Sequence, residues 1–270
     1  MSTAEREYRA LCDSGGVHLW QGATHTPPST ADLRLLSAAE RAVMHRRSRQ
    51  DGLRYAGAHI AVRRVLARYL GVAPAGIRFG TTPCPSCADP RHGRPVVEAP
   101  RTGLEFNLSH AGPHWALAVT CAGQVGVDVE VAAVAADAAA AADGRSDSAG
   151  GAASLVLSPA ELTHLDSLLD DGARQAAFLR CWTRKEAVVK AIGVGITGDL
   201  TSLEVHPEDP GPLVVSSTDG GDWLVQDVPS RSDLFVALAR PASSAGPVVL
   251  RTQESTLTHS LLEPFASSRS

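Results

Sequence analysis

Apolar and polar residues alternate over residues 124–130, which read Gln-Val-Gly-Val-Asp-Val-Glu. A period of two is typical of a β-strand. It predicts that the three valines share one face and that Asp128 and Glu130 lie side by side on the other. Two carboxylates held this close repel each other, and a divalent cation between them relieves the repulsion. The strand is therefore a candidate cation site; the alternative is an edge strand whose acidic side chains face water.

Helical patterns precede this strand. Ser37, followed three residues later by Glu40, has the capping-box spacing of a helix start. A second helix is predicted over residues 53–70, where apolar residues recur near helical spacing until Gly71, a residue typical of C-caps. Residues 17–20 are a plausible first strand, before a Pro-rich loop.

Further strands are predicted around the alternating segment. The turn at residues 122–123 predicts that 115–120 and 124–130 pair as a hairpin. A long helix is expected over 173–192, closed by Gly193. The remaining strands are expected at 104–109, 202–205, 213–216, 223–228 and 234–239.

The helix start at residues 36–40 is echoed at residues 157–161, and each precedes an arginine-bearing helix that ends in glycine. The echo predicts two similar α+β halves with a ligand pocket between them. The alternative is that Leu-Ser-x-x-Glu is simply a common helix start. The expected division is an N-terminal half (1–131), an Ala/Asp/Gly/Ser-rich linker (132–154), a C-terminal half (155–240) and a C-terminal tail (241–270).

Composition narrows the class of protein. The chain has 270 residues, is 44% hydrophobic and carries a net charge of -4, so it can bury a sizeable core and has no cationic excess for nucleic acid. The sequence has no apolar signal region and no run long enough to span a membrane. We therefore expect a cytoplasmic monomer without a nucleic-acid or membrane partner. Five cysteines without a disulfide spacing pattern indicate reduced thiols.

The predicted helix over 173–192 carries a second set of charged residues. Glu186 and Lys190 lie one turn apart on one face, with Trp182 one turn earlier. One interpretation is a surface salt bridge beside a core tryptophan, which contributes little to stability. The other is that Glu186 is a third oxygen ligand for a cation at Asp128 and Glu130, while Lys190 faces a phosphate.

Phosphate partners are available elsewhere in the chain. Ser109 and His110 end a predicted strand, where an imidazole can donate to phosphoryl oxygens, although a lone histidine is usually structural. Arg94 stands isolated in a loop, and a guanidinium binds phosphate with paired donors. The arginines of the first-half helices, which include Arg46 and Arg49, are as well explained by solvated faces.

Other motifs are weaker or missing. Cys84, Cys87 and the nearby His92 invite a zinc interpretation, but they offer only three ligands. The sequence contains no dinucleotide fingerprint, no phosphate-binding P-loop and no nucleophile elbow. A phosphorylated ligand must therefore be held by basic side chains rather than by a glycine-rich loop.

Taken together and in order, four segments resemble the Sfp-type 4'-phosphopantetheinyl transferases. They are G-R-P at 93–95, F-N-L-S-H at 106–110, V-G-V-D-V-E at 125–130 and W-T-R-K-E-A-V-V-K-A-I-G at 182–193. The resemblance spans residues 36–240. It implies an α+β fold of two similar halves related by a pseudo-twofold, each with helices packed on a small antiparallel sheet.

The resemblance also implies an activity. Members of this family bind coenzyme A and Mg²⁺ between the halves and transfer the phosphopantetheine arm to a serine of an apo acyl or peptidyl carrier protein. Adenosine 3',5'-bisphosphate is released. Such carriers serve fatty-acid synthesis and the secondary metabolism of polyketides and non-ribosomal peptides; the sequence does not single out one of them.

By motif match, Asp128, Glu130 and Glu186 would bind the cation that bridges the pyrophosphate. Glu186 would also be the base for the incoming serine hydroxyl, directly or through water. Lys190 would stabilise charge on the pyrophosphate and protonate the leaving group.

The phosphate side follows from the same match. His110 and Ser109 would contact phosphate, and Arg94 stands near the 3'-phosphate, where the family often has lysine. Arg46 and Arg49 fall at the family's basic helix positions for the same end of coenzyme A. The linker, the Cys84 loop and the tail have no counterpart in this scheme.

Two other functions fit parts of the sequence. A metal-dependent phosphohydrolase acting on coenzyme A or a related nucleotide would use the same carboxylates, although no second metal site is evident. A non-catalytic carrier-binding module would have no reason to hold Asp128, Glu130, Glu186 and Lys190 in motif.

Overall fold

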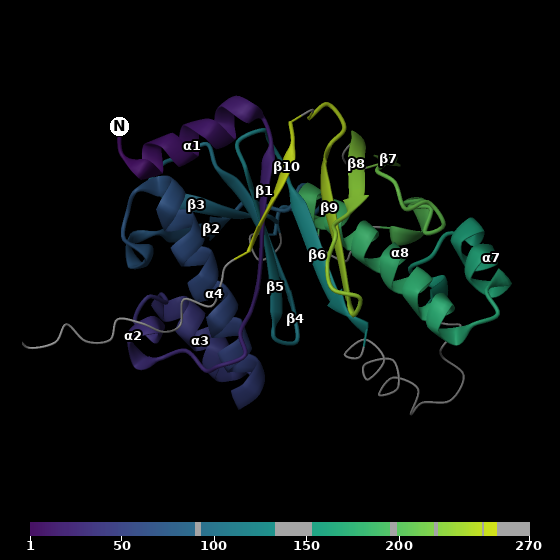
Figure 1. Ribbon diagram of the computed structural model, residues 1–270, viewed down its shortest axis with the longest axis horizontal. Helices are drawn as coiled ribbons and strands as arrows, with labels where there is room; N and C mark the ends of the chain where they lie inside the picture. Colours follow the sequence, from purple (N-terminus) through teal and green to yellow (C-terminus); the bar gives the residue numbers. More distant parts are fainter. Residues whose placement is uncertain (90–92, 133–152, 195–198, 219–220, 245, 253–270) are drawn as a thin grey trace, which may run out of the picture.

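The computed structural model describes residues 1–89, 93–132, 153–194, 199–218, 221–244 and 246–252. These residues form the predicted mixed α+β fold, in which helices flank a central set of strands (Figure 1). The helices are α1 (Thr3–Ser14), α2 (Thr30–Leu33), α3 (Ala38–Arg46), α4 (Arg49–Leu70), α7 (Pro159–Ser167) and α8 (Asp171–Ile192), with 3₁₀ turns η1 (Pro74–Gly76) and η3 (Leu200–Ser202). The strands are β1 (Val17–Ala23), β2 (Arg78–Thr81), β3 (Pro95–Ala99), β4 (Glu105–Ala111), β5 (His114–Thr120), β6 (Gly126–Val131), β7 (Leu213–Ser217), β8 (Gly221–Asp227), β9 (Leu234–Pro241) and β10 (Val248–Thr252).

Two four-stranded sheets and one hairpin organise the described strands. The first sheet has the order β10-β1-β5-β4, the second has the order β6-β9-β8-β7, and β2 pairs with β3. The second sheet is antiparallel, as predicted. The first is mixed, because β10 lies parallel to β1. β10 comes from the segment predicted to be a tail.

The predicted hairpin between β5 and β6 is wrong. β6 pairs with β9 along its whole length, whereas β5 pairs with β1 and β4. The turn at Gly123, which has φ +104°, leads the chain out of the first sheet instead of back along it. β6 still touches the first sheet through side chains: its Val127 amide donates to Asn107 Oδ1 at 3.1 Å. A short turn alone could not distinguish these two routes.

Each sheet packs a long helix on one face, and the two sheets meet at their other faces. α4 covers β4 and β5, and α8 covers β6, β8 and β9 (Figure 1). The buried valines of β6 pack against β1 and β5, including Leu19 and Ala118. The predicted valine face of β6 is thus confirmed, and it forms the contact between the two parts of the fold. The division at residue 131 stays a prediction, although β6 belongs to the second sheet by hydrogen bonding.

The two predicted helix starts carry the same buried ion pair. Ser37 and Ser158 each form a capping box with the glutamate three residues on. Glu40 then accepts from Arg63 at 2.6 Å, and Glu161 from Lys185 at 2.6 Å. Each cation also donates to two backbone carbonyls, those of Pro74 and Ile77 for Arg63 and those of Val156 and Leu200 for Lys185. This repetition is compatible with two similar halves.

Several boundaries differ from the predicted ones. α4 begins at Arg49 rather than at residue 53, because Ser48 caps it by accepting from the Asp51 amide. Residues 202–205 are not a strand, since η3 occupies Leu200–Ser202. Helix α1 and strands β2 and β3 were not predicted. The predicted linker lies almost wholly outside the described residues.

The expectation of reduced thiols is wrong for two cysteines. Cys12 of α1 and Cys121, which follows β5, form a disulfide with their Cα atoms 5.0 Å apart. They lie 109 residues apart in the sequence, so no local spacing could reveal the pair. Cys84, Cys87 and Cys181 do not form disulfides.

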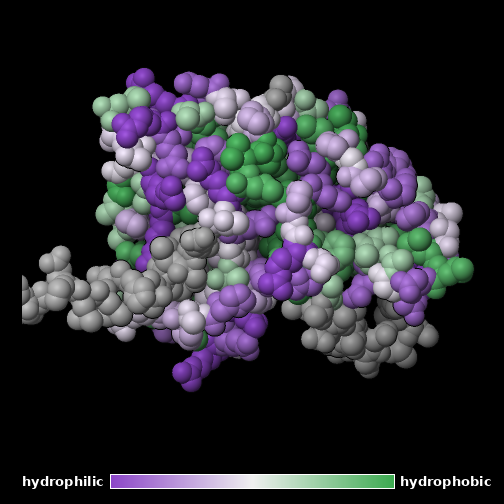
Figure 2. Space-filling view, in the orientation of Figure 1, coloured by the Kyte–Doolittle hydropathy of each residue, from purple (hydrophilic) through white to green (hydrophobic). Residues whose placement is uncertain are grey.

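On the face that Figure 2 shows, an apolar area lies near the centre, among polar side chains. Figure 2 shows hydrophobic side chains gathered over the region of β10, whose Val249 and Leu250 are 38% and 47% exposed. Among the described helices, none is both long enough and apolar enough to span a bilayer.

The buried pair of Lys185 and Glu161 predicts a large cost for its disruption. Both side chains are at most 1% exposed, so Lys185→Met leaves a buried carboxylate without its cation. We expect a loss of roughly 3–5 kcal/mol in the free energy of unfolding, measured by urea denaturation. Arg174→Met, which breaks the exposed pair with Asp171 on the same helix, should cost about 0.5 kcal/mol or less. Equal losses in the two variants would contradict this assignment.

Candidate active site

Three elements converge where the two sheets meet: β4, β6 and α8. Gly126 makes the approach of β6 to α8 possible, because a Cβ there would lie 1.9 Å from the carbonyl oxygen of Ala187. On the other side, the Val129 amide donates to Ser109 Oγ of β4 at 3.3 Å. Asp128 is thereby held between a strand of the first sheet and the helix of the second.

Asp128 is the most enclosed carboxylate of the group, at 3% exposure. Its Oδ1 accepts from Ser109 Oγ at 2.8 Å and from Lys190 Nζ at 2.5 Å. Lys190 also donates to Ser109 Oγ at 3.0 Å. The second carboxylate oxygen, Oδ2, is buried without a hydrogen-bond partner among the described residues. Lys190, which was expected either to pair with Glu186 or to face a phosphate, thus contacts Asp128 and Ser109.

Glu130 and Glu186 complete the group of carboxylates. Glu130 Oε1 accepts from Trp182 Nε1 at 3.1 Å. Burial, followed by the charge of Asp128, raises the pKa of Glu130 to about 6. Burial also raises the pKa of Glu186, and Asp128 adds to this effect while Lys190 opposes it. The Oε1 atom of Glu186 is buried and has no partner in the described part of the chain.

These carboxylates suit a hard cation in their chemistry. Mg²⁺ prefers carboxylate oxygens, and two buried oxygens, one each on Asp128 and Glu186, lack a partner. The geometry is not a finished metal site: within the described residues, no group of three or more His, Cys, Asp or Glu side chains is placed to hold a metal ion. Lys190 supplies positive charge at Asp128 instead. The zinc interpretation gains no support, and His92 lies outside the described residues.

Ser109 lies on the face of β4 that contacts β6, whereas His110 lies on the opposite face and lines a cavity. This cavity of ≈ 600 Å³ lies between α3, α4, the β2–β3 hairpin and β4. Burial, with smaller contributions from the charges of His59 and Arg47, lowers the pKa of His110, so the imidazole is neutral at pH 7. The residues lining the cavity include the polar groups Ser37, Glu40, His59, Arg63, Arg78, Glu98 and His110 and the aromatic rings of Phe79 and Phe106.

The three predicted arginines are less closely associated with the carboxylates. Arg94 Nη1 pairs with Glu105 Oε2 at 2.6 Å, and its side chain packs on Gly193, the C-cap of α8. Arg46 and Arg49 are exposed, at the end of α3 and the start of α4. Arg47 lies between them, and its guanidinium is 4.9 Å from the centre of the Tyr55 ring. That ring meets the His110 ring edge to face, with the centroids 6.4 Å apart.

The profile of the 4'-phosphopantetheinyl transferase superfamily matches residues 124–239, which contain β6 and α8. The chain is 30% identical over 213 residues to the 4'-phosphopantetheinyl transferase HetI of Nostoc sp., covering 74% of this chain and 78% of the relative. The chain belongs to the 4'-phosphopantetheinyl transferase superfamily. It is also 26% identical over 212 residues to a 4'-phosphopantetheinyl transferase of Bacillus subtilis, covering 77% of this chain and 84% of the relative. A third relative is the protein slr0495 of Synechocystis sp., which is named as a 4'-phosphopantetheinyl transferase. The two chains are 28% identical over 220 residues, which is 80% of each chain.

In this member of the superfamily, the sequence did not reveal the residues of α4 that lie at the cavity or beside it. Tyr55, His59 and Arg63 lie on one face of α4. Their spacing of four residues is a detectable signal, but it is equally typical of an ordinary core face. Arg78 and Phe79 were missed because no element was predicted over residues 78–80, which begin β2.

The raised pKa of Glu130 predicts a stability effect that depends on pH. An unfolded glutamate loses its proton near pH 4.5 and the folded one near pH 6, so stability is lost as the pH rises through this window. With a chelator present at pH 8, Glu130→Gln should raise the free energy of unfolding by about 1 kcal/mol after allowing for solvent screening, and the melting temperature should rise with it.

The gain should disappear near pH 4.5, where the wild-type side chain is itself neutral. Glu204→Gln, a matched change at an exposed position, should have no such effect. Calorimetry or circular dichroism at both pH values gives the comparison. A Glu130→Gln variant that is less stable than the wild type at pH 8 would show that the charged form of Glu130 does not destabilise the folded protein.

Proposed function

We propose that this protein is an Sfp-type transferase that moves the 4'-phosphopantetheine arm of coenzyme A to a serine of an apo carrier protein. The observation that carries the proposal is the contact of Lys190 with Asp128 and Ser109, with the unpartnered Glu186 oxygen on the same helix. An ammonium group and carboxylates at this junction provide the positive charge and the proton acceptor that pyrophosphate cleavage by an alcohol requires. Membership of the superfamily supports this reaction and not a specific carrier.

The cavity beside His110 is our proposed site for the nucleotide end of coenzyme A. Its volume of ≈ 600 Å³ suits a nucleotide-sized group, and its aromatic and arginine side chains suit a base and a phosphate. The neutral imidazole of His110 can donate one hydrogen bond to a phosphate oxygen. Arg94, Arg46 and Arg49 are proposed to contribute positive charge at the 3'-phosphate end; their positions in the family motif support this role more than their contacts do.

In the proposed reaction, the serine oxygen of the carrier forms a bond to the β-phosphorus of coenzyme A. The bond from this phosphorus to the bridging oxygen breaks and releases adenosine 3',5'-bisphosphate. Glu186 takes the serine proton, and its raised pKa makes it a stronger base than an ordinary glutamate. Lys190 neutralises the leaving oxygen and can donate a proton to it.

Mg²⁺ is the proposed metal ion, held by Asp128, Glu130 and Glu186. When bound, it would neutralise charge on the pyrophosphate. The raised pKa values of Glu130 and Glu186 support this assignment, because a cation would offset the repulsion among the carboxylates. For Asp128 to take part, Lys190 must turn from the aspartate toward phosphate. Its side chain is 28% exposed and lies near the end of α8, where it has room to do so.

The carrier is proposed to be an acyl or peptidyl carrier domain of fatty-acid, polyketide or non-ribosomal peptide synthesis. The domain division at residue 131 and the pseudo-twofold relation of the halves are part of the same proposal. They are supported by the repeated pairs Glu40–Arg63 and Glu161–Lys185.

A transfer assay tests the proposed function. The protein is incubated with coenzyme A, Mg²⁺ and each of several apo carriers, and intact-mass spectrometry should show one added phosphopantetheine group per carrier. Asp128→Asn and Glu186→Gln should each lower kcat/KM by roughly 10³-fold or more, because each weakens the proposed Mg²⁺ site and the second also removes the proposed base. Asp171→Asn, at an exposed carboxylate on the same helix, should leave the rate unchanged.

Two results would overturn the proposal. One is the absence of modification on every carrier in the panel. The other is release of adenosine 3',5'-bisphosphate without any carrier, at a rate that adding a carrier does not change. The second outcome would identify a phosphohydrolase that uses the same carboxylates.

A further inference from the structure

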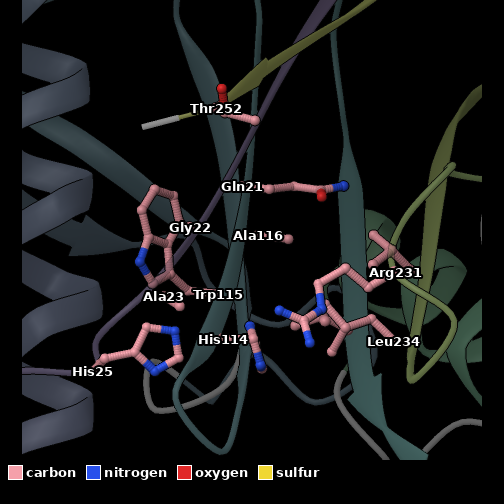
Figure 3. A pocket seen from close by; sticks show the side chains of 12 residues that line it. Gln21, Gly22, Ala23, His25, His114, Trp115, Ala116, Arg231, Leu234 and Thr252 are labelled. Atoms are coloured by element: carbon pink, nitrogen blue, oxygen red, sulfur yellow. The ribbon is translucent and has the colours of Figure 1, made fainter. Parts of the chain in front are cut away.

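A second cavity lies between the two sheets, on the opposite face of β6 from the carboxylates. It has a volume of ≈ 310 Å³ and is enclosed by β1 and β5 on one side and by β6, β9 and the loop before β9 on the other (Figure 3). Val129 contributes to its wall, while its neighbours Asp128 and Glu130 point toward α8. The proposed transfer reaction makes no use of this cavity.

The cavity combines an apolar wall with a set of hydrogen-bond donors. The wall includes Trp115, Val129 and Val236. Figure 3 shows the guanidinium group of Arg231 extending toward the imidazole of His114, with His25 on the far side of that ring. The rings of His25 and His114 meet edge to face, with their centroids 5.9 Å apart.

Three side chains at the cavity carry hydrogen-bond donors. Arg231 meets Asp233 through Nε at 3.4 Å, and its side chain is 73% exposed, so its terminal nitrogens are open to solvent or to a ligand. Gln21 Nε2 is buried and has no hydrogen-bond partner among the described residues. Burial lowers the pKa of His114, and the charges of His25 and Arg231 lower it further, while Asp233 opposes them. The buried amide of Gln21 is thus the donor that a ligand in this cavity would satisfy.

We infer that this cavity binds a small organic carboxylate, with its apolar body against Trp115 and Val129 and its carboxylate at Arg231 and His114. A guanidinium and an imidazole N–H both donate to carboxylate oxygens, and the amide of Gln21 adds a further donor at the cavity wall. A metal ion fits less well, because no third His, Cys, Asp or Glu ligand joins the two histidines within the described residues. A neutral apolar ligand would leave the buried Gln21 amide unsatisfied.

The volume limits the ligand to a compact molecule. Cavities near the lower end of the usual range, about 300 Å³, hold small drug-like or metabolite-sized ligands. Octanoate carries a single carboxylate and an unbranched apolar chain, so it serves as the probe. Octanamide, which has the same body without the charge, is its matched control.

Calorimetric titration of the full chain with octanoate tests the inference. Wild-type protein should bind octanoate and should bind octanamide at least about tenfold more weakly, since a charge-assisted hydrogen bond is lost. Arg231→Gln should weaken octanoate binding by about tenfold, while Arg101→Gln, an exposed arginine away from the cavity, should not change it. Ala23→Leu, which fills the cavity, should weaken both ligands.

The pH and the presence of coenzyme A give two further readouts. A carboxylate favours the protonated form of His114, so octanoate should bind about tenfold more tightly at pH 6 than at pH 8. The groups facing His114 in this comparison are His25, Arg231 and Asp233. Saturating coenzyme A should not displace octanoate. Displacement by coenzyme A, equal effects of Arg231→Gln and Arg101→Gln, or no binding up to about 10 mM octanoate would each overturn the inference.

Discussion

The organisation of this protein depends on one electrostatic constraint: three carboxylates lie close together where two sheets and a helix meet. Asp128, Glu130 and Glu186 share one nearby ammonium group, that of Lys190. Burial is the main cause of the raised pKa values of the two glutamates, and the charge of Asp128 adds to it. A fold that keeps such a group must hold it rigidly and must gain from it in function.

Rigidity comes from features on both sides of the carboxylates. Gly126 lets β6 lie directly on α8, and the side chains of Asn107 and Ser109 accept hydrogen bonds from the β6 backbone. On α8 itself, Lys185 forms an ion pair with Glu161 and donates hydrogen bonds to two backbone carbonyls. The residue that precedes Glu186 is therefore fixed in the core, and this limits how far the Glu186 side chain can move.

The sequence was most informative where the local pattern and the chemistry agreed. The alternation over residues 124–130 predicted both the valine face of β6 and the carboxylates on its other face, and the capping boxes at Ser37 and Ser158 predicted α3 and α7. Pairings between distant segments were not predictable from local patterns. The partner of β6, the parallel pairing of β10 and the disulfide from Cys12 to Cys121 all join segments far apart in the chain. The cavity beside His110 was missed for the same reason, because its walls come from four separate segments.

We propose that Asp128, Glu130 and Glu186 form a cation site whose affinity depends on coenzyme A. Binding of Mn²⁺, a paramagnetic substitute for Mg²⁺ among oxygen ligands, can be followed by electron paramagnetic resonance with and without coenzyme A. We expect one Mn²⁺ site in the wild type, tighter with coenzyme A, and at least about tenfold weaker binding in Glu186→Gln. Equal Mn²⁺ affinity in the wild type and in Glu186→Gln, unchanged by coenzyme A, would contradict it.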